Sequence, residues 1–369
     1  MISWQLIFQL LLIAVFVGSI PLMYSASKGS LNQLQNVVWV ILFLTFDLIL
    51  FGAFTRLTDS GLGCPDWPGC YGHSNPIMAM DQILEAQSQM PFGPVTVTKA
   101  WIEMLHRYFA SGVGFLIVCL MAITWFKRAI FGRRVFYFCC GLFLLVSLQG
   151  AFGALTVTMR LQPMIVAMHL MLALLLVVGL TALTEVIQIR DGVFKPKMYS
   201  LLIPMLLMLI VYVQIFLGAW VSTNYAVLAC FDFPQCNGEW MPSLDFLNGF
   251  TWWRELGKTA AGDNLNTQAL MAIHWTHRVG ALIVTVSISL FLLFLHQIRP
   301  YGNAQWSARA AYWKKYLLFV LCIQILSGIS NVIFQWPMMA ALIHTGGSAA
   351  LLIGLTKLTS LSLYPSAHQ

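Results

Sequence analysis

Four histidines lie inside long apolar segments of the chain and form two matched pairs. His106 and His277 each precede an arginine near the start of such a segment, and His169 and His344 lie near the start of a later one. Polar side chains in hydrocarbon are costly and usually functional. The members of each pair enter a membrane from the same face to similar depth, so two helices can present two imidazoles at one level. Two facing imidazoles are the ligand set of a b-type haem, and the sequence therefore predicts one haem site for each pair.

Other interpretations of these histidines stay open at this point. A buried histidine can simply be hydrogen-bonded to a neighbouring helix. Imidazoles also bind zinc, but structural zinc sites usually have four protein ligands and catalytic sites three, so histidine pairs favour haem. In the second pair, His274 lies one turn before His277 and competes with it as a ligand.

An arginine follows the first histidine of each pair, as Arg107 and Arg278. Guanidinium groups favour bidentate contacts with carboxylates, so we interpret both arginines as partners of haem propionates. The alternative is that they extend toward lipid head groups at the membrane surface.

The two pairs differ at one position. Glu103 lies three residues before His106, on the same helix face, and His274 takes this place before His277. A carboxylate one turn from a haem ligand is a candidate proton donor or acceptor. Its alternative role is an ion pair with Lys99 or Arg107. The difference predicts chemistry at the first site and a permanent electron-carrying haem at the second.

Two cysteine pairs of identical spacing lie in the two longest polar loops, Cys64 with Cys70 and Cys230 with Cys236. The spacing permits a local disulfide in each loop, provided that the loops face an oxidising compartment. We expect such bonds to shape the loops, in preference to a role in thiol–disulfide exchange.

The elements that position these residues are long apolar helices. The chain has 369 residues, of which 59% are hydrophobic and only 9% charged, so it predicts an all-α integral membrane protein embedded in a lipid bilayer. We expect nine membrane spans, at residues 4–24, 36–55, 101–125, 134–157, 164–187, 199–222, 270–296, 314–334 and 338–362. The first is expected to be a retained helix, although a cleaved signal peptide is the alternative.

The net charge of +7 does not indicate a nucleic-acid partner, because the basic residues gather in alternate loops. The positive-inside rule places these loops in the cytoplasm and the cysteine loops on the outer side. The basic residues used for this orientation are Lys28, Lys127, Arg128, Arg133, Arg134, Arg190, Lys195, Lys197, Arg299, Arg309, Lys314, Lys315 and Lys357.

The chain also repeats itself. Both cysteines recur after 166 residues, the His-Arg pair after 171 and the last histidine after 175. An even number of spans per repeat keeps both repeats in the same orientation. We therefore expect an extra N-terminal helix with its linker at 1–35 and two pseudo-symmetric four-helix bundles, at 36–198 for the substrate and at 199–369 for the permanent haem.

The segment Gly52-Ala-Phe-Thr-Arg-Leu-Thr-Asp-Ser-Gly-Leu-Gly-Cys-Pro-Asp-Trp-Pro-Gly-Cys70 resembles the first-loop signature of the haem A synthases, membrane enzymes that convert haem O to haem A. The resemblance continues through a glutamate, two His-Arg pairs and two later histidines, and it covers nearly everything from residue 36 onward. It is carried by Glu103, His106, Arg107, His169, His277, Arg278 and His344. The extra N-terminal helix exceeds the family's usual eight spans.

The resemblance implies a haem b held by His277 and His344, with Arg278 nearby. It also implies that haem O docks near His106, His169 and Arg107 and that Glu103 is essential for oxidising its C8 methyl group to a formyl group.

The resemblance further implies a bacterial inner membrane, with the cysteine loops on the periplasmic side. Haem O synthase is the expected upstream partner, and a terminal oxidase is the expected consumer of the product. The electron donor stays open, with a ferredoxin-type protein as one candidate, and so does assembly into a homo-oligomer. Competing hypotheses are a non-catalytic haem carrier for oxidase assembly and a di-haem electron-transfer protein, which would place haems near both membrane faces.

Overall fold

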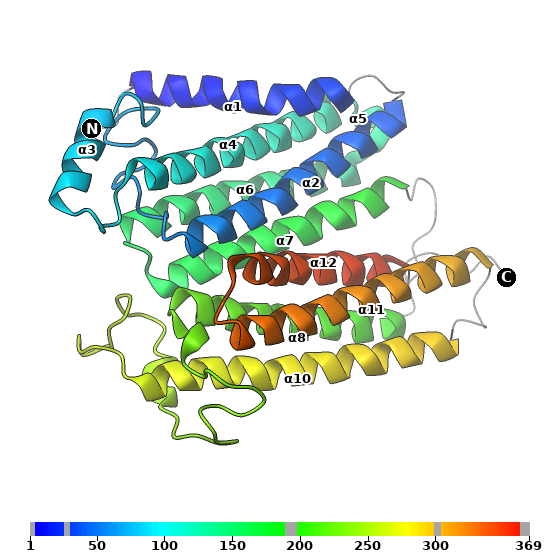
Figure 1. The fold of residues 1–369 in the computed structure, drawn as a ribbon. Coiled ribbons are helices and arrows are strands. Elements are labelled where there is room, and N and C mark those ends of the chain that lie inside the picture. The colour runs from blue at the N-terminus through cyan, green and yellow to red at the C-terminus, as the bar shows by residue number, and fades with distance from the viewer. Residues whose placement is uncertain (1–3, 26–29, 189–197, 299–303, 362–369) are drawn as a thin grey trace. The chain divides into compact units, whose positions relative to one another are not determined.

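The computed structural model describes residues 4–25, 30–188, 198–298 and 304–361 (Figure 1). Within these residues, nine helices are long and apolar enough to cross a membrane, which confirms the prediction of an all-α membrane protein. They are α1 (Trp4–Ser25), α2 (Ser30–Leu57), α4 (Val97–Phe126), α6 (Arg133–Thr158), α7 (Pro163–Gln188), α8 (Met198–Thr223), α10 (Thr267–Ile298), α11 (Ala304–Ile333) and α12 (Met338–Leu361).

One helix begins much earlier than expected. α11 starts at Ala304, ten residues before the predicted start of its span, so Arg309 is helical and the prediction of a loop at this residue is wrong. A helix can extend past the hydrocarbon because long basic side chains reach back to the interface. Five of the basic residues used to predict orientation lie outside the described residues: Lys28, Arg190, Lys195, Lys197 and Arg299.

The chain forms two compact units, residues 1–187 and 188–369. In the first unit, α4 contacts α1, α2 and α6, and the cysteine loop adds the short helix α3 (Met80–Gln89). A single turn, α5 (Arg128–Phe131), joins α4 to α6. The division of roles between 36–198 and 199–369 stays a prediction.

In the second unit, α10 contacts α8 and α11, while α12 contacts α8 and α11. Its cysteine loop contains the 3-10 turn η1 (Ala226–Leu228) and the short helix α9 (Phe246–Gly249). Both units thus consist of helical hairpins joined at one end by a structured loop.

The outward faces of the helices are apolar. Along α1, for example, Trp4 and Phe16 expose 85% and 69% of their surface. Exposed apolar side chains suit lipid, and helices satisfy all backbone hydrogen bonds within the segment, as a bilayer requires. The sequence therefore folds with its polar residues collected inside each unit and at the helix ends.

The extra helix α1 is an integral part of the first unit. A Cβ atom added to Gly18 would lie 2.5 Å from Cδ1 of Phe115, and one added to Gly112 would lie 2.6 Å from Cγ1 of Val17. Small residues at such crossings let helix backbones approach closely in a membrane. The packing of α1 on α4 therefore depends on these two glycines.

Candidate functional site

The four paired histidines lie in the first three turns of their helices. His106 lies nine residues after the first residue of α4, and His169 six residues after that of α7. In the second unit, His277 lies ten residues into α10 and His344 six residues into α12. At a rise of about 1.5 Å per residue, the members of each pair differ in depth by about one helical turn.

In the first unit, each histidine packs against a glycine of a neighbouring helix. A Cβ atom added to Gly52 of α2 would lie 3.1 Å from Nε2 of His106, and one added to Gly153 of α6 would lie 3.3 Å from Cε1 of His169. A glycine inside a helix costs about 1 kcal/mol relative to alanine, so its presence indicates that the space is needed.

The second unit repeats this packing with the corresponding residues. A Cβ atom at Gly218 of α8 would lie 2.9 Å from Cε1 of His277, and one at Gly328 of α11 would lie 3.2 Å from Cε1 of His344. In each unit, two glycines thus line one side of the space that the two imidazoles occupy, and we call these two residues the glycine wall. The sequence contained the signal for them, because Gly153 and Gly328 share the offset of the last histidines.

The imidazoles of His277 and His344 are spaced for a metal between them. Their ring centroids lie 6.4 Å apart, and their planes meet at 84°. Two metal–nitrogen bonds of about 2 Å would separate the coordinating nitrogens by about 4 Å, and the two ring radii account for the remainder. Their Nδ1 atoms contact Gln214 at 2.9 Å and Ser327 at 3.0 Å. Nε2 of Gln214 also donates to the backbone carbonyl of His277 at 2.9 Å. The spacing of the two rings, with Ser327 at Nδ1 of His344, fits a bis-histidine haem.

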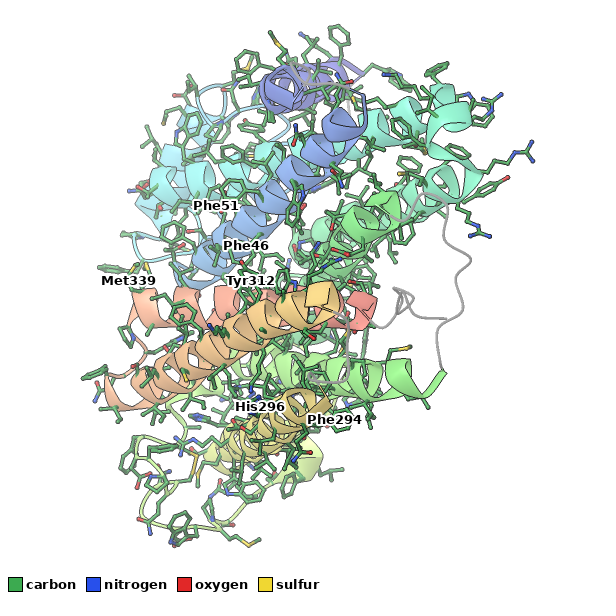
Figure 2. The ribbon with its side chains drawn as sticks, turned by 90° about the vertical axis from the view of Figure 1, so that its right-hand side faces the viewer. Phe46, Phe51, Phe294, His296, Tyr312 and Met339 are labelled. Carbon is green, nitrogen blue, oxygen red and sulfur yellow. A yellow bond between two sulfur atoms is a disulfide. The ribbon has the colours of Figure 1, made fainter. Side chains whose placement is uncertain are left out.

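The imidazoles of His106 and His169 have a more apolar environment. Phe51 of α2, labelled in Figure 2, makes an edge contact with His106 at 5.7 Å between ring centroids and 76°. Within the described residues, Nδ1 of His169 has no hydrogen-bond partner, since the nearby Gln149 carbonyl lies outside hydrogen-bond geometry. These rings are therefore held by packing.

The zinc interpretation finds no support in the part of the chain that the structure describes. No group of three or more histidine, cysteine, aspartate or glutamate side chains there could hold a metal ion. Because zinc sites in proteins take three or four such ligands, the histidine pairs fit haem better.

The two predicted disulfides are present. Cys64 is bonded to Cys70 and Cys230 to Cys236, at S–S distances of 2.08 and 1.95 Å. All four residues are buried, and each disulfide packs in a small apolar cluster under its loop.

A tight turn follows each disulfide. Tyr71 and Gly72 have φ values of 49° and 76°, and Asn237 and Gly238 have 58° and 84°. An aspartate supports each turn. The carboxylate of Asp66 accepts hydrogen bonds from the amides of Tyr71 and Gly72, at 2.6 and 2.7 Å.

Asp232 does the same for Asn237 and Gly238, at 2.5 and 2.8 Å. Desolvation acts to raise the pKa of Asp232, but the amides of Gly238 and Asn237 and the charge of Arg278 together lower it below its ordinary value. The charged carboxylate is therefore part of the folded turn.

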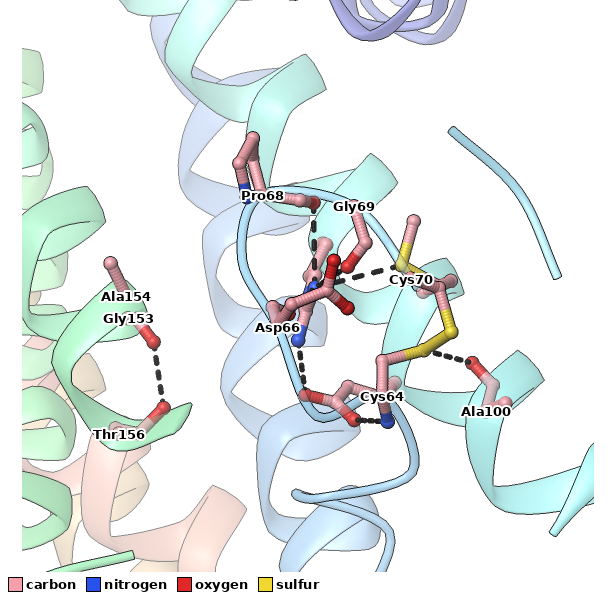
Figure 3. Close-up of polar contacts among 12 residues, drawn as sticks. Cys64, Asp66, Pro68, Gly69, Cys70, Ala100, Gly153, Ala154 and Thr156 are labelled. Atoms are coloured by element: carbon pink, nitrogen blue, oxygen red, sulfur yellow. Dashed lines mark hydrogen bonds and ion pairs between the residues drawn. A yellow bond between two sulfur atoms is a disulfide. The ribbon is translucent and has the colours of Figure 1, made fainter. Parts of the chain in front are cut away.

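Arg107 and Arg278 donate hydrogen bonds to backbone carbonyls of these loops. Nη1 of Arg107 donates to the carbonyls of Asp66 and Gly69 at 2.9 and 2.5 Å. Figure 3 shows the loop that carries Asp66 and Gly69, with the disulfide between Cys64 and Cys70. Nη1 of Arg278 likewise donates to the carbonyls of Asp232 and Gln235, at 2.8 and 2.7 Å. These carbonyl contacts were not expected from the sequence, and a contact with a haem propionate stays a prediction.

Glu103 is buried, with 4% of its surface exposed. Its Oε1 accepts from Nη2 of Arg107 at 2.5 Å, and its Oε2 accepts from the amide of Cys64 at 2.7 Å. The ion pair with Arg107 that the sequence offered as an alternative is thus present, whereas Lys99 donates to the Gly93 carbonyl instead. The carboxylate is thus bound to the disulfide loop and to Arg107, on the helical turn that precedes His106.

His274 occupies the equivalent place in the second unit. Its Nδ1 faces the amide of Cys230 at 3.4 Å, and its Nε2 faces Nε of Arg278 at 3.3 Å. Because both nitrogens of His274 contact the loop anchor, this arrangement favours His277 as the iron ligand. A neutral imidazole has a single acceptor nitrogen, so it can satisfy only one of these two donors.

The sequence is similar to those of known proteins. The family model described as "Cytochrome oxidase assembly protein" (COX15-CtaA) matches residues 35–356. A protein of Shewanella oneidensis named "Heme A synthase" is 37% identical over 328 residues, which are 88% of this chain and 94% of that protein. A "Heme A synthase" of Methylobacterium radiotolerans is 29% identical over 348 residues, 87% of this chain and 88% of its own. One of Allorhizobium ampelinum is 26% identical over 364 residues, 93% of this chain and 94% of its own.

Proposed function

Because this chain belongs to the COX15-CtaA family of cytochrome oxidase assembly proteins, we propose that it is a haem A synthase, an oxidoreductase that acts on haem O in the membrane. Its relatives of high coverage carry this name. The reaction would convert the C8 methyl group of haem O to a formyl group, with oxygen and an external electron carrier as co-reactants.

The observation that supports this function best is the difference between Glu103 and His274. Two similar histidine pairs would suit a carrier of two haems equally well. A buried carboxylate beside one pair alone suits a site where protons are moved, because a carboxyl group in an apolar environment can hold or release a proton during a reaction. We therefore assign haem O to His106 and His169.

Glu103 would act as the proton-transferring group at this site. Its two oxygens are held by Arg107 and the amide of Cys64, so its position relative to His106 is fixed. Arg107 balances the charge of the carboxylate, and the disulfide loop above limits the access of water. The Gly52 and Gly153 wall would leave room for the two imidazoles beside the substrate ring.

The second pair would hold haem b through His277 and His344. Bound there, haem b would supply electron transfer. We further propose that the protein lies in the bacterial inner membrane with its cysteine loops on the periplasmic side, and that haem O synthase delivers its substrate. The electron donor, for which a ferredoxin-type protein is a candidate, and a homo-oligomeric state belong to the same proposal.

The decisive experiment is expression of the chain with a haem O synthase, followed by haem extraction and chromatography. Haem A or its hydroxymethyl precursor is the expected product. Haem O alone, in a folded preparation that contains haem, would contradict the enzyme and indicate a carrier. The matched control is Glu103→Gln, which keeps the size of the side chain and an acceptor for the Cys64 amide.

A further inference from the structure

A buried arginine in the cysteine loop of the second unit has no counter-charge. Arg254 lies between α9 and α10, and only 5% of its surface is exposed. Its Nη1 donates to the Lys258 carbonyl at 3.1 Å, and its Nη2 donates to Oδ1 of Asn224, so both acceptors are neutral. In the part of the chain that the structure describes, no carboxylate lies within ion-pair distance of Arg254, and its Nε is buried without a partner.

A second unsatisfied polar group lies in the same loop. Within the described residues, Oγ1 of Thr259 is buried and has no hydrogen-bond partner. Thr259 directly follows Lys258, whose carbonyl binds Arg254. Burial lowers the pKa of Arg254, and no carboxylate acts in the opposite direction. Because a buried cation without a counter-charge is strongly destabilising, this pair of unsatisfied groups is suited to an anion.

Contacts with α8 place Arg254 at the end of that helix. The guanidinium carbon of Arg254 lies 5.8 Å from the ring centroid of Trp220. Its acceptor Asn224 directly follows α8. The indole N–H of Trp220 donates to the Gly249 carbonyl at 2.9 Å. Arg254 therefore lies just beyond the part of α8 that carries Gly218 of the glycine wall.

The loop also packs on the face of α10 that carries His277. A Cβ atom added to Gly249 would lie 2.8 Å from the carbonyl oxygen of Ala269 and 3.4 Å from Cγ1 of Ile273. Ala269, Ile273 and His277 follow one another at intervals of four residues, so they lie along one face of the helix. The loop that carries Arg254 thus contacts the two helical turns that precede the ligand.

Haem b would bring suitable anions to this place. Its ring carries two propionate carboxylates on one edge. With the iron held by His277 and His344, these charges must face an end of the helices, because charged groups are costly in hydrocarbon. The nearer end is the start of α10, since His277 lies ten residues from the beginning of a helix of 32 residues. Arg254 belongs to the loop at this end.

Arg278, which the sequence offers as a propionate partner, is largely occupied. Its Nε faces Nε2 of His274, and both hydrogens of its Nη1 are taken by loop carbonyls. Its Nη2 donates to the Cys230 carbonyl. Four of its five N–H groups are thus used, and a bidentate carboxylate contact needs two. Arg254 retains its Nε hydrogen and one hydrogen on each terminal nitrogen.

We propose that Arg254 binds a propionate of haem b at the second site, with the hydroxyl of Thr259 as a further donor. The cysteine loop of the second unit is then part of the haem site. This inference rests on the proposed function, since it assumes that His277 and His344 hold haem b.

The test compares haem b with its dimethyl ester, in which methyl groups block both carboxylates. The full-length chain is made in a His106→Ala background, in cells that cannot synthesise haem, and is loaded in detergent with either form. Transfer to excess apomyoglobin gives the rate of release. Hydrogen bonds to charged groups contribute about 10- to 100-fold in affinity, so the ester should leave the parent chain faster by about that factor.

Variants of the loop identify the group that recognises the carboxylate. Arg254→Leu should release haem b about as fast as the parent chain releases the ester, and it should release both forms alike. Thr259→Val should reduce the difference between the two forms to a smaller extent, and Thr259→Ser should restore it. The matched control is Lys258→Ala, because Lys258 carries a charge in the same loop but its Nζ donates to Oδ1 of Asn264 at 2.8 Å.

A purely structural role of Arg254 gives a different result. Both forms would then leave Arg254→Leu faster by an equal factor, so the difference between haem b and the ester would persist, and this result would overturn the inference. Equal release of the two forms from the parent chain, or uptake of neither form, would overturn it as well.

Co-expression with haem O synthase separates this inference from the proposed function. If the natural chain makes haem A while Arg254→Leu preserves the difference between the two forms, the inference fails and the proposed function stands. If the natural chain makes no haem A while Arg254→Leu removes the difference, the proposed enzyme activity fails, and the second unit still binds haem through Arg254.

Discussion

The two units share the residues that pack against their histidines and anchor their disulfide loops, but they differ in other residues near the histidines. Each has two glycines against the imidazoles and an arginine that grips a disulfide loop. The units differ beside the ligands, where the first unit has Glu103 and the second has His274 at the corresponding position. They differ again behind the ligands, where Leu48 and Phe152 stand in place of Gln214 and Ser327. In the proposed function, the repeated residues bind a haem in each unit, and the differing residues determine whether that haem reacts.

The largest effect should come from removing one ligand in each unit. His344→Ala should reduce haem b per protein by more than about 100-fold, because loss of a direct ligand exceeds the loss of an outer partner. His169→Ala should keep the haem b absorbance and abolish haem A. Absorbance spectra and haem extraction measure both.

Added imidazole provides a control for this first prediction. It should restore the spectrum of His344→Gly, since a free imidazole can fill the space. An unchanged spectrum in His344→Ala would place the ligand elsewhere and remove the basis of the comparison.

The next effect concerns the residue beside each first ligand. Glu103→Gln should lower product formation by about 100-fold or more, the usual contribution of a proton-transferring group, with haem b unchanged. His274→Glu should keep haem b and raise thermal stability slightly, since a carboxylate can accept from both Cys230 and Arg278. Product assays and thermal unfolding in detergent test the pair. Equal loss of haem b and product in Glu103→Gln would give Glu103 a structural role.

A smaller effect should follow from filling the glycine wall. Gly218→Ala brings a Cβ atom to 2.9 Å from His277, closer than the 3.3 Å of Gly153→Ala to His169. Overpacking costs about 1–3 kcal/mol, so Gly218→Ala should lower haem b occupancy about tenfold, while Gly153→Ala should be tolerated better. Haem content per protein gives the order. The reverse order would show that the imidazoles move freely at these positions.

The smallest effect concerns the turn beyond the second disulfide. Because the pKa of Asp232 is lower in the folded protein than its ordinary 3.8, its carboxylate supports the turn fully above that value. This support is lost only as the pH falls through the lower, folded pKa. Hydrogen exchange at Gly238, corrected for the intrinsic rate, should therefore stay slow at about pH 4 and rise below it. In Asp232→Asn, exchange should be faster and independent of pH in this range, and an unaltered profile would exclude this role.

The sequence predicted the spans well, because the length of an apolar segment and the charge of its flanks carry strong signals. It also predicted the disulfides, which close short loops of fixed spacing. It did not predict the hydrogen bonds of Arg107 and Arg278 to the loops. Their acceptors are backbone carbonyls, which every residue type has, so the sequence cannot indicate them. It also missed α3, a short helix within a polar loop.

The environment of the histidines was partly readable. The glycines repeat at the same offsets as the histidines, so the wall could have been found by aligning the halves. The partners of Nδ1 could not, because Gln214 and Ser327 contact rings that belong to other helices, and such contacts depend on how the helices pack. A difference between the two repeats does not by itself show whether the residue has a function.

The pairing of each histidine with a glycine has a consequence for recognising and building such sites. A histidine introduced alone into an apolar helix has no space beside it and would tilt or disrupt the crossing. Searches for haem-binding membrane proteins should therefore look for two residues together, an imidazole on one helix and a missing side chain on the next. A design that transfers such a site to another protein should include the glycine on the neighbouring helix as well as the histidine.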